Sequence, residues 1–227
     1  SLLPRLINSD KIDFSYLYIP CETLGGDFID IFMIDDTHLG LYIADVSGHG
    51  VPASLLTVFL RSSINKKLLS PAKALEELYI EFNKGKIDDE LYITVFYCII
   101  DLEERTMLYS NAGLNVAPII FGRDRFEILR HPGIPICNWT DKPGYHNGFA
   151  KLNQNDKLFV YTDGILEIRD RDNNQYGEDR MLEILLDDGL SPHHRLLALK
   201  RSAFQFAGIN SARELKDDIT MGLLEFK

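Results

Sequence analysis

The sequence has few cysteines, no long apolar run and a shortage of positive charge. Its three cysteines, Cys21, Cys98 and Cys137, are odd in number and far apart, so they predict neither a disulfide framework nor a zinc site and fit a reducing compartment. The longest apolar run, residues 91–100, falls short of the roughly 18 residues of a membrane span, and no signal peptide pattern opens the sequence. We therefore expect a cytoplasmic domain without membrane contact.

The shortage of positive charge excludes another class of partner. The chain has 24 Lys and Arg against 34 Asp and Glu, a formal net charge of −10 and a pI near 5.0. Such a chain does not attract nucleic acid phosphates, so nucleic acid is not expected as a ligand. A protein of this charge that acts on a phosphorylated substrate needs cations to overcome the repulsion, and carboxylates can recruit them.

What the sequence does contain is enough apolar material for one folded domain. Hydrophobic residues make up 45% of the 227 residues and charged residues 26%, a balance typical of a globular protein with a buried core. The sequence has no internal repeat, low-complexity tract or linker. We predict a single domain over residues 1–227.

Two periodicities alternate in blocks along the chain. Runs of aromatic and β-branched residues predict strands at 12–19, 28–34, 39–44, 91–100, 106–110, 116–121, 126–130, 157–162 and 219–225. A period of about 3.6 residues predicts two helices within 51–83, and further helices at 178–187 and 193–207. Strands thus come in runs with paired helices between them, which favours an α+β fold of antiparallel sheets with helices packed outside.

The two helices within 51–83 differ in how clearly they are marked. In the first, the apolar residues that fall mostly on one face are Val51, Leu55, Val58, Phe59 and Leu68. In the second, Ser70 is a natural N-cap and Pro71 suits the first helical position. Residues 91–100, which follow, are apolar almost throughout and predict a central strand covered on both faces.

Four aspartates, Asp27, Asp45, Asp163 and Asp217, lie at the ends of predicted strands, each beside a small or turn-forming residue. Strand ends hold side chains where loops leave a sheet open to a ligand, and glycines allow the backbone to approach closely. Each aspartate taken alone is most simply a turn residue. If the four ends converge, however, their carboxylates repel one another unless cations lie between them, and Mg²⁺ or Mn²⁺ prefers such oxygen ligands.

Several motifs support convergence because they occur together and in order. They are GGDF at 25–28, ADVSGHG at 44–50, YTDGILE at 161–167 and DDIT at 217–220. Between them lie TVFYCIID at 94–101, SNAG at 110–113 and GIPI at 133–136. With these motifs the sequence resembles the PPM-type metal-dependent serine/threonine protein phosphatases. It is most similar to the bacterial branch typified by the sporulation phosphatase SpoIIE and the stress-response phosphatase RsbU, over nearly the whole chain.

The resemblance implies a four-layer α-β-β-α sandwich and a site that binds two Mn²⁺ or Mg²⁺ ions. In such enzymes the aspartate that matches Asp45 bridges the two metals, and the carbonyl that matches Val46 binds one of them. The aspartates that match Asp163 and Asp217 complete the coordination of the other metal. The aspartate that matches Asp27 helps to hold the second metal. All four aspartates are therefore expected to be catalytic as well as metal-binding, with Asp218 as an auxiliary neighbour.

The resemblance also implies a reaction and its partners. A two-metal site lowers the pKa of a water molecule for direct attack on phosphorus, so no covalent phosphoenzyme is required. Enzymes of this branch dephosphorylate a serine or threonine on an anti-sigma-factor antagonist and so free a sigma factor. Residues 1–4 (SLLP) resemble the end of a helical linker, so we expect an upstream sensor or receiver domain that signals through the helices within 51–83. Such a linker could also join two copies of the chain as a homodimer.

Some residues depart from the family pattern and leave alternatives open. Leu114 stands where the family commonly has histidine after SNAG, so a proton transfer or phosphate contact made there is lost or supplied elsewhere. His49 and His131 are candidate replacements. A domain that has lost turnover and only binds a partner is the main alternative to an enzyme. GGDF is also similar to the GGDEF signature of diguanylate cyclases, but DVSGHG and TDG have no place in that class.

Overall fold

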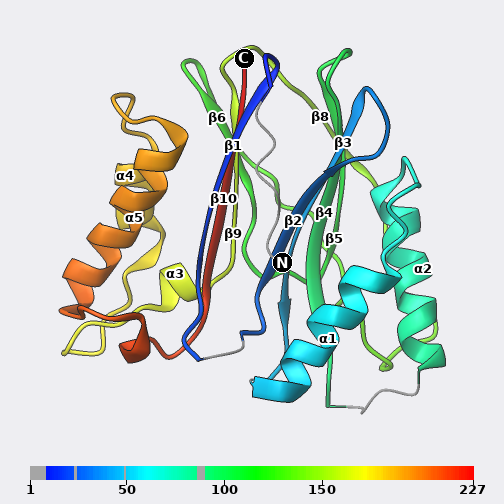
Figure 1. Ribbon diagram of the computed structural model, residues 1–227, viewed down its shortest axis with the longest axis horizontal. Coiled ribbons are helices and arrows are strands. Elements are labelled where there is room, and N and C mark those ends of the chain that lie inside the picture. Colours follow the sequence, from blue (N-terminus) through cyan, green and yellow to red (C-terminus); the bar gives the residue numbers. More distant parts are fainter. Residues whose placement is uncertain (1–8, 23–24, 49, 86–89) are drawn as a thin grey trace.

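The computed structural model describes residues 9–22, 25–48, 50–85 and 90–227, and it forms two antiparallel sheets packed face to face (Figure 1). In order across the first sheet, the strands are β1 (Ile12–Ile19), β10 (Ile219–Phe226), β9 (Lys157–Tyr161), β6 (Ile119–Gly122) and β7 (Arg125–Ile128). In order across the second, they are β2 (Phe28–Met33), β3 (His38–Val46), β4 (Ile93–Asp101), β5 (Thr106–Ala112) and β8 (Gly148–Lys151).

Helices cover the outer face of each sheet. α1 (Gly50–Ser63) and α2 (Pro71–Lys84) pack on the second sheet, while α4 (Gly177–Leu185) and α5 (Pro192–Ala207) lie over the first, with the short α3 (Gly164–Glu167) below them (Figure 1). This arrangement confirms the predicted four-layer α-β-β-α sandwich. None of the described helices is long and apolar enough to cross a bilayer.

Buried apolar side chains form two clusters that hold the layers together. One fills the space between the sheets and continues under α4 and α5, with Phe14, Phe96 and Leu223 fully buried. The other lies between the second sheet and the α1–α2 layer. β4 is the middle strand of its sheet and is buried over eight of its nine residues, so the predicted central strand is confirmed.

The first helix is present, but most of its predicted apolar face points away from the sheet, and only Phe59 and Leu68 of that set pack against the buried cluster. Val51 and Leu55 are 63% and 65% exposed, and Leu68 lies beyond the end of the helix at Ser63. The residues that face the sheet are Ala53, Leu56, Thr57 and Leu60. Small residues occur on this face because the helix lies close to the main chain. The Thr57 hydroxyl donates to the carbonyl of Gly26 at 3.4 Å, and a Cβ on Gly26 would lie 3.7 Å from that of Ala53.

Other element ends follow the sequence signals. The Ser70 hydroxyl accepts from the N–H of Lys73 at the start of α2, and Gly208 ends α5 with a φ of +68°. The sequence did not predict β8, α3 or the 3₁₀ helix η1 (Ala212–Glu214), which are among the shortest elements of the fold. Two of these short elements, α3 and η1, flank the site described next.

Candidate active site

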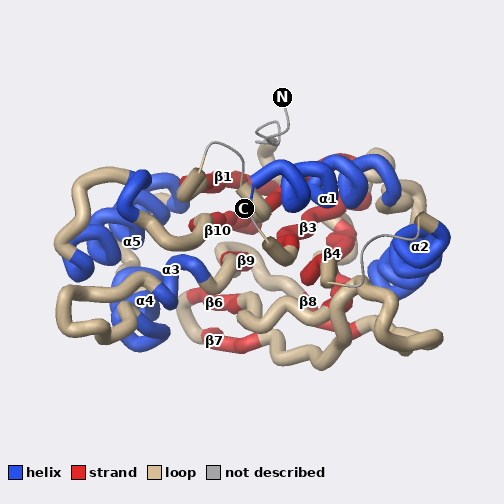
Figure 2. The backbone as a smooth tube through the Cα atoms, turned by 90° about the horizontal axis from the view of Figure 1, so that it is seen from below, coloured by secondary structure: helices blue, strands red, loops and turns tan. Residues whose placement is uncertain are grey.

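The second sheet brings Asp27 and Asp45 together at the end of the molecule that Figure 2 shows face on. Phe28 in β2 pairs with Ala44 in β3, so the same antiparallel register places Asp27 opposite Asp45. Asp45 is also held from its other side, because the hydroxyl of Thr94 in β4 donates to the Asp45 carbonyl at 3.0 Å. Two predicted site residues are therefore cross-strand neighbours.

The first sheet brings the remaining aspartates to the same end. β9 and β10 pair through Tyr161 and Met221, and beyond that pair the N–H of Thr162 donates to the carbonyl of Thr220 at 3.0 Å. Asp163 follows directly after β9, and Asp217 comes two residues before β10. Both aspartates therefore lie at the same end of the first sheet.

Hydrogen bonds across the two sheets join the two groups of aspartates. The Asp218 carboxylate accepts from the backbone N–H groups of Cys21 (2.9 Å), Gly26 (2.7 Å) and Asp27 (3.2 Å). In return, the hydroxyl of Thr162 donates to the Asp27 carboxylate at 2.6 Å. Asp218, which the resemblance made an auxiliary neighbour of the ligands, thus fixes the backbone that carries Asp27.

Two glycines permit this close approach. A Cβ on Gly25 would lie 2.1 Å from Oδ2 of Asp218, and a Cβ on Gly164 would lie 1.9 Å from the Asp218 carbonyl oxygen. A side chain at Gly164 would displace the main chain of Asp218, and one at Gly25 would displace the side chains of Asp218 and Tyr18. The glycines of the GGDF and TDG motifs are therefore required by packing around Asp218.

The electrostatics of the cluster are unfavourable in the protein alone. Burial, together with the charges of Asp163 and Asp217, raises the pKa of Asp45 to about 7. Burial and the charge of Asp45 raise the pKa of Asp27 well above its ordinary value. The pKa of Asp217 is raised by burial and by Asp163, against a hydrogen bond from the Asp218 N–H. In the described parts of the chain, no Lys or Arg forms an ion pair with these carboxylates.

The donor set suits a hard divalent cation, although the side chains are not gathered around one point. Asp45, Asp217 and Asp218 line a cavity of about 340 Å³. Within the described residues, however, no three His, Cys, Asp or Glu side chains are grouped as metal ligands. The hydrogen bonds explain why, since Asp163 accepts from Asn115 and Asp218 accepts from the backbone. Carboxylate oxygens with raised pKa values and no basic partner still fit Mg²⁺ or Mn²⁺ by charge and chemistry.

Val46, the remaining predicted ligand, is placed by its backbone. A Cβ on Gly26 would lie 2.9 Å from the Val46 carbonyl oxygen, so this carbonyl lies against the segment that carries Asp27. Val46 itself is the last residue of β3, and its side chain is buried. The structure therefore brings Asp27, Asp45 and Val46 to one place.

Asn115 is a site residue that the sequence did not reveal. Its side-chain amide donates to Oδ2 of Asp163 at 2.6 Å. The loop that presents it is fixed by Asn111, whose amide donates to the carbonyls of Leu114 and His131 and whose oxygen accepts from the Leu114 N–H. Leu114 is buried in the core, so Asn115, not Leu114, is directed toward the aspartates. Only its position two residues after the SNAG motif could have signalled this.

Among the described residues, the alternative acid and nucleophiles are engaged elsewhere or inert. The Nε2 atom of His131 lies 2.8 Å from the carbonyl oxygen of His146, and His49 lies outside the described residues. Cys98 and Cys137 are buried. Cys21 lines the aspartate cavity, but burial and a hydrogen bond with Asp218 raise the pKa of its thiol to about 12, so the thiol stays protonated.

The chain is similar to a family of known proteins. The family model described as Stage II sporulation protein E (SpoIIE) matches residues 35–227. Phosphoserine phosphatase RsbP of Bacillus subtilis is 27% identical over 174 residues, which are 74% of this chain and 42% of that protein. Phosphoserine phosphatase RsbU of the same species is 24% identical over 171 residues, 73% of this chain and 50% of that protein. The chain thus spans half or less of the length of these relatives.

Solved structures show the same fold. The SiaA-PP2C domain of Pseudomonas aeruginosa superposes with a TM-score of 0.81 at 20% identity, covering 94% of this chain and 86% of that one. A structure of the PP2C phosphatase domain and a regulatory fragment of SpoIIE from Bacillus subtilis has a TM-score of 0.78 at 17% identity, covering 96% and 62%. RsbX in complex with magnesium has a TM-score of 0.72 at 17% identity, covering 98% and 99%.

Proposed function

Because this chain belongs to the SpoIIE family, we propose that it is a metal-dependent phosphatase that hydrolyses phosphoserine or phosphothreonine on a protein. The observation that carries this proposal is that Asp27, Asp45 and Asp217, from both sheets, have raised pKa values and form no ion pair with a Lys or Arg of the described residues. A cluster of this kind is costly in the protein alone and becomes favourable when cations are bound. The names of the relatives RsbP and RsbU, both phosphoserine phosphatases, support the same reaction class.

In this proposal Asp27, Asp45, Asp163, Asp217 and the carbonyl of Val46 hold two Mg²⁺ or Mn²⁺ ions. When bound, such ions supply two effects, a lower pKa for a water molecule and neutralisation of phosphoryl oxygens. The cross-strand pair Asp27 and Asp45 fixes the second-sheet side of the site, and Asp163 and Asp217 fix the other. The thiol of Cys21 stays protonated and so supplies no thiolate nucleophile, which agrees with direct attack by water on phosphorus.

The substrate we propose is a phosphorylated anti-sigma-factor antagonist, which would place the reaction in the cytoplasm. Residues 1–227 would form one phosphatase domain at the C-terminal end of a longer regulatory protein, with a sensor domain upstream. The direct route for its signal is α1, which follows Asp45 within five residues and contacts Gly26. Dimerisation through the preceding segment would fit this arrangement. Incubation with a phosphorylated antagonist from the same genome tests the substrate, and a domain that cleaves aryl phosphate but not this protein would contradict it.

The test of the activity is phosphate release from an aryl phosphate with Mn²⁺ or Mg²⁺. We expect release with either ion, loss in EDTA, and loss in Asp163→Asn. The matched control is Asp124→Asn, which removes an exposed carboxylate in the β6–β7 turn and should leave activity unchanged. Equal turnover of wild type and Asp163→Asn would refute the site assignment.

A binding module without turnover is the second candidate. Two observations favour it, namely the ungrouped carboxylates within the described residues and the buried Leu114 at the position of the family histidine. Titration calorimetry separates the two functions. Binding of Mn²⁺ together with phosphate release supports the enzyme, whereas neither binding nor release supports the binding module.

A further inference from the structure

A second cavity lies directly beside the aspartates. It has a volume of about 400 Å³ and includes Asp217 in its wall. Its other walls come from α3, the loop at 168–173, the end of α5 and the segment that contains η1. Ile168, Ala207 and Leu215, all buried, give it an apolar base. The proposed reaction at the aspartates does not account for this cavity.

The acidic residues at the rim of this cavity are mostly engaged in local structure. The Asp170 carboxylate accepts from the N–H groups of Asp172 and Asn174, both at 2.9 Å, and from the Asn174 amide. The Glu214 carboxylate accepts from the N–H groups of residues 210 and 211, both at 3.0 Å. These two carboxylates therefore stabilise, through hydrogen bonds, the loops that form the cavity wall. Glu167 lies at the aspartate end, where its charge helps to raise the pKa of Asp217.

Two basic residues at the same rim are not engaged in this way. Arg171 and Lys216 are exposed, and neither forms an ion pair with any carboxylate of the described residues. Lys216 lines both this cavity and the aspartate cavity, so it lies where the two meet. Arg171 lies farther along the rim, near Gly208. The cavity is lined by three basic residues, Arg169, Arg171 and Lys216, and by four acidic residues, Glu167, Asp170, Glu214 and Asp217. Arg169 donates to the carbonyl of Asn173 at 2.9 Å, which leaves Arg171 and Lys216 as the cations that can meet an external acidic group.

We propose that this cavity, the docking cavity, binds the segment of the phosphoprotein substrate next to the phosphorylated serine. An apolar side chain of that segment would occupy the base formed by Ile168 and Leu215, and acidic side chains would meet Lys216 and Arg171. The inference rests on the proposed phosphatase function and deepens it by naming a substrate preference. Its physical basis is local charge complementarity between the exposed Lys216 and Arg171 and the acidic side chains of the substrate.

The test compares two phosphoserine peptides with an aryl phosphate, all with Mn²⁺. One peptide carries acidic residues and one leucine beside the phosphoserine, and the other replaces the acidic residues by glutamine and asparagine. We expect wild type to prefer the acidic peptide about fivefold in kcat/KM, as for a single favourable charge contact. Arg171→Glu should remove this preference through KM and leave turnover of the aryl phosphate within about twofold.

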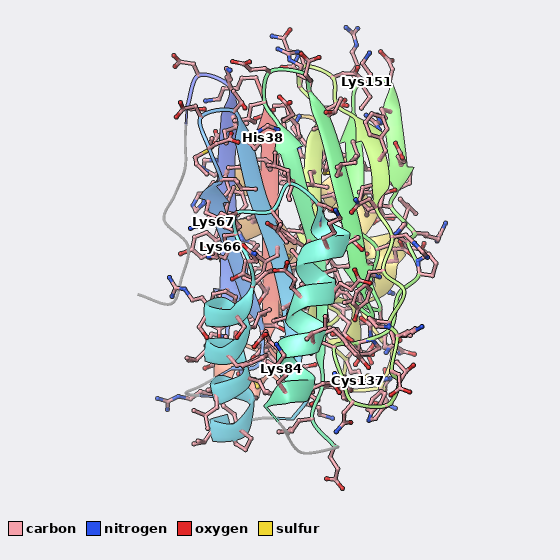
Figure 3. All side chains as sticks on the ribbon, turned by 90° about the vertical axis from the view of Figure 1, so that its right-hand side faces the viewer. His38, Lys66, Lys67, Lys84, Cys137 and Lys151 are labelled. Carbon is pink, nitrogen blue, oxygen red and sulfur yellow. The ribbon has the colours of Figure 1, made fainter. Side chains whose placement is uncertain are left out.

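The control variant is Lys151→Glu, which makes the same charge change at the far end of the strands (Figure 3). It should keep the peptide preference. Equal rates on both peptides in wild type, or an equal loss on all three substrates in Arg171→Glu, would overturn the docking cavity while the phosphatase function stands. If wild type releases phosphate from none of the three substrates, the proposed function itself fails and the docking cavity fails with it.

Discussion

Buried aspartates occur in two kinds of surroundings in this molecule. Asp30 and Asp156 are 6% and 4% exposed, and each contacts a basic side chain, Lys66 in the first case and Arg125 in the second. Asp27, at the site, is 5% exposed and contacts no Lys or Arg among the described residues. The chain thus pairs its buried carboxylates where they serve structure. Where they gather at the site, their charge is left for a group from solution to balance.

The largest expected effect comes from removing a central carboxylate of the unpaired group. Asp45→Asn should lower kcat by about a thousandfold, since it removes the proposed bridging ligand, and should weaken Mn²⁺ binding in calorimetry. Asp30→Asn is the comparison, because Asp30 is buried more deeply than Asp45 but lies outside the site, and a folded variant should keep its turnover. A fully active Asp45→Asn would end the distinction between the two kinds of aspartate.

The pH dependence of stability should also distinguish the site aspartates, whose pKa values are raised, from a carboxylate whose pKa is lowered. The folded pKa of Asp45, about 7, lies above its ordinary value of 3.8, and that of Asp27 is raised as well. The folded state therefore binds more protons than the unfolded chain between these values, so the free energy of unfolding falls as pH rises from 4 to 7. The contribution of Asp45 alone is about 4 kcal/mol at most.

Urea unfolding of the metal-free protein at pH 5 and pH 8 measures this effect. Wild type should be less stable at pH 8, Mg²⁺ or Mn²⁺ should restore stability, and Asp45→Asn should reduce the pH dependence. Asp35 has the opposite sign, since hydrogen bonds from the Thr37 N–H and from His38 lower its pKa to about 2. Its contribution is lost only as pH falls below 4. Equal stability of the metal-free wild type at both pH values would contradict the raised pKa values.

A smaller effect is expected from breaking a paired aspartate. Lys66 lies in the connection between α1 and α2 and pairs with Asp30 (Figure 3). Lys66→Met should destabilise the fold because it leaves the buried Asp30 without its partner. We expect a loss of about 2 kcal/mol, a value that already includes a reduction for the partial exposure of the lysine. Lys67→Met is the matched control. Chemical unfolding should distinguish them, and equal stabilities would mean that the Asp30 pair contributes nothing.

The smallest expected effect concerns orientation within the site. Asn115→Ala removes the amide that donates to Asp163, so Mn²⁺ affinity in calorimetry should fall about tenfold while the fold remains intact. Asn115→Gln keeps an amide and should recover part of the affinity. Unchanged affinity in Asn115→Ala would show that Asp163 is oriented without this contact.

The sequence was sufficient for most of the strands and helices and for the position of the aspartates at strand ends. Both are local properties, since period and turn residues depend on near neighbours in the chain. The face that α1 presents to the sheet was not predictable, because it depends on how closely the helix approaches Gly26, which lies outside the helix. The larger apolar residues Val51 and Leu55 predicted that the opposite face of α1 contacts the sheet, but both are exposed.

The finer features of the site depend on contacts between distant segments. The carboxylate of Asp218 accepts from the N–H of Cys21, nearly two hundred positions away in the chain, whereas the family resemblance made Asp218 only an auxiliary neighbour of the ligands. Asn115 reaches Asp163 only because Asn111 folds its loop back. Neither role has a local signature, since asparagine and aspartate are ordinary turn residues.

The close seat of α1 on the second sheet has a mechanical consequence. The Thr57 hydroxyl contacts the Gly26 carbonyl, and a Cβ on Gly26 would lie 3.7 Å from the Cβ of Ala53, so the helix has little room to move toward the main chain. A force on the exposed Val51 and Leu55 would therefore act on Gly26, whose neighbour is Asp27.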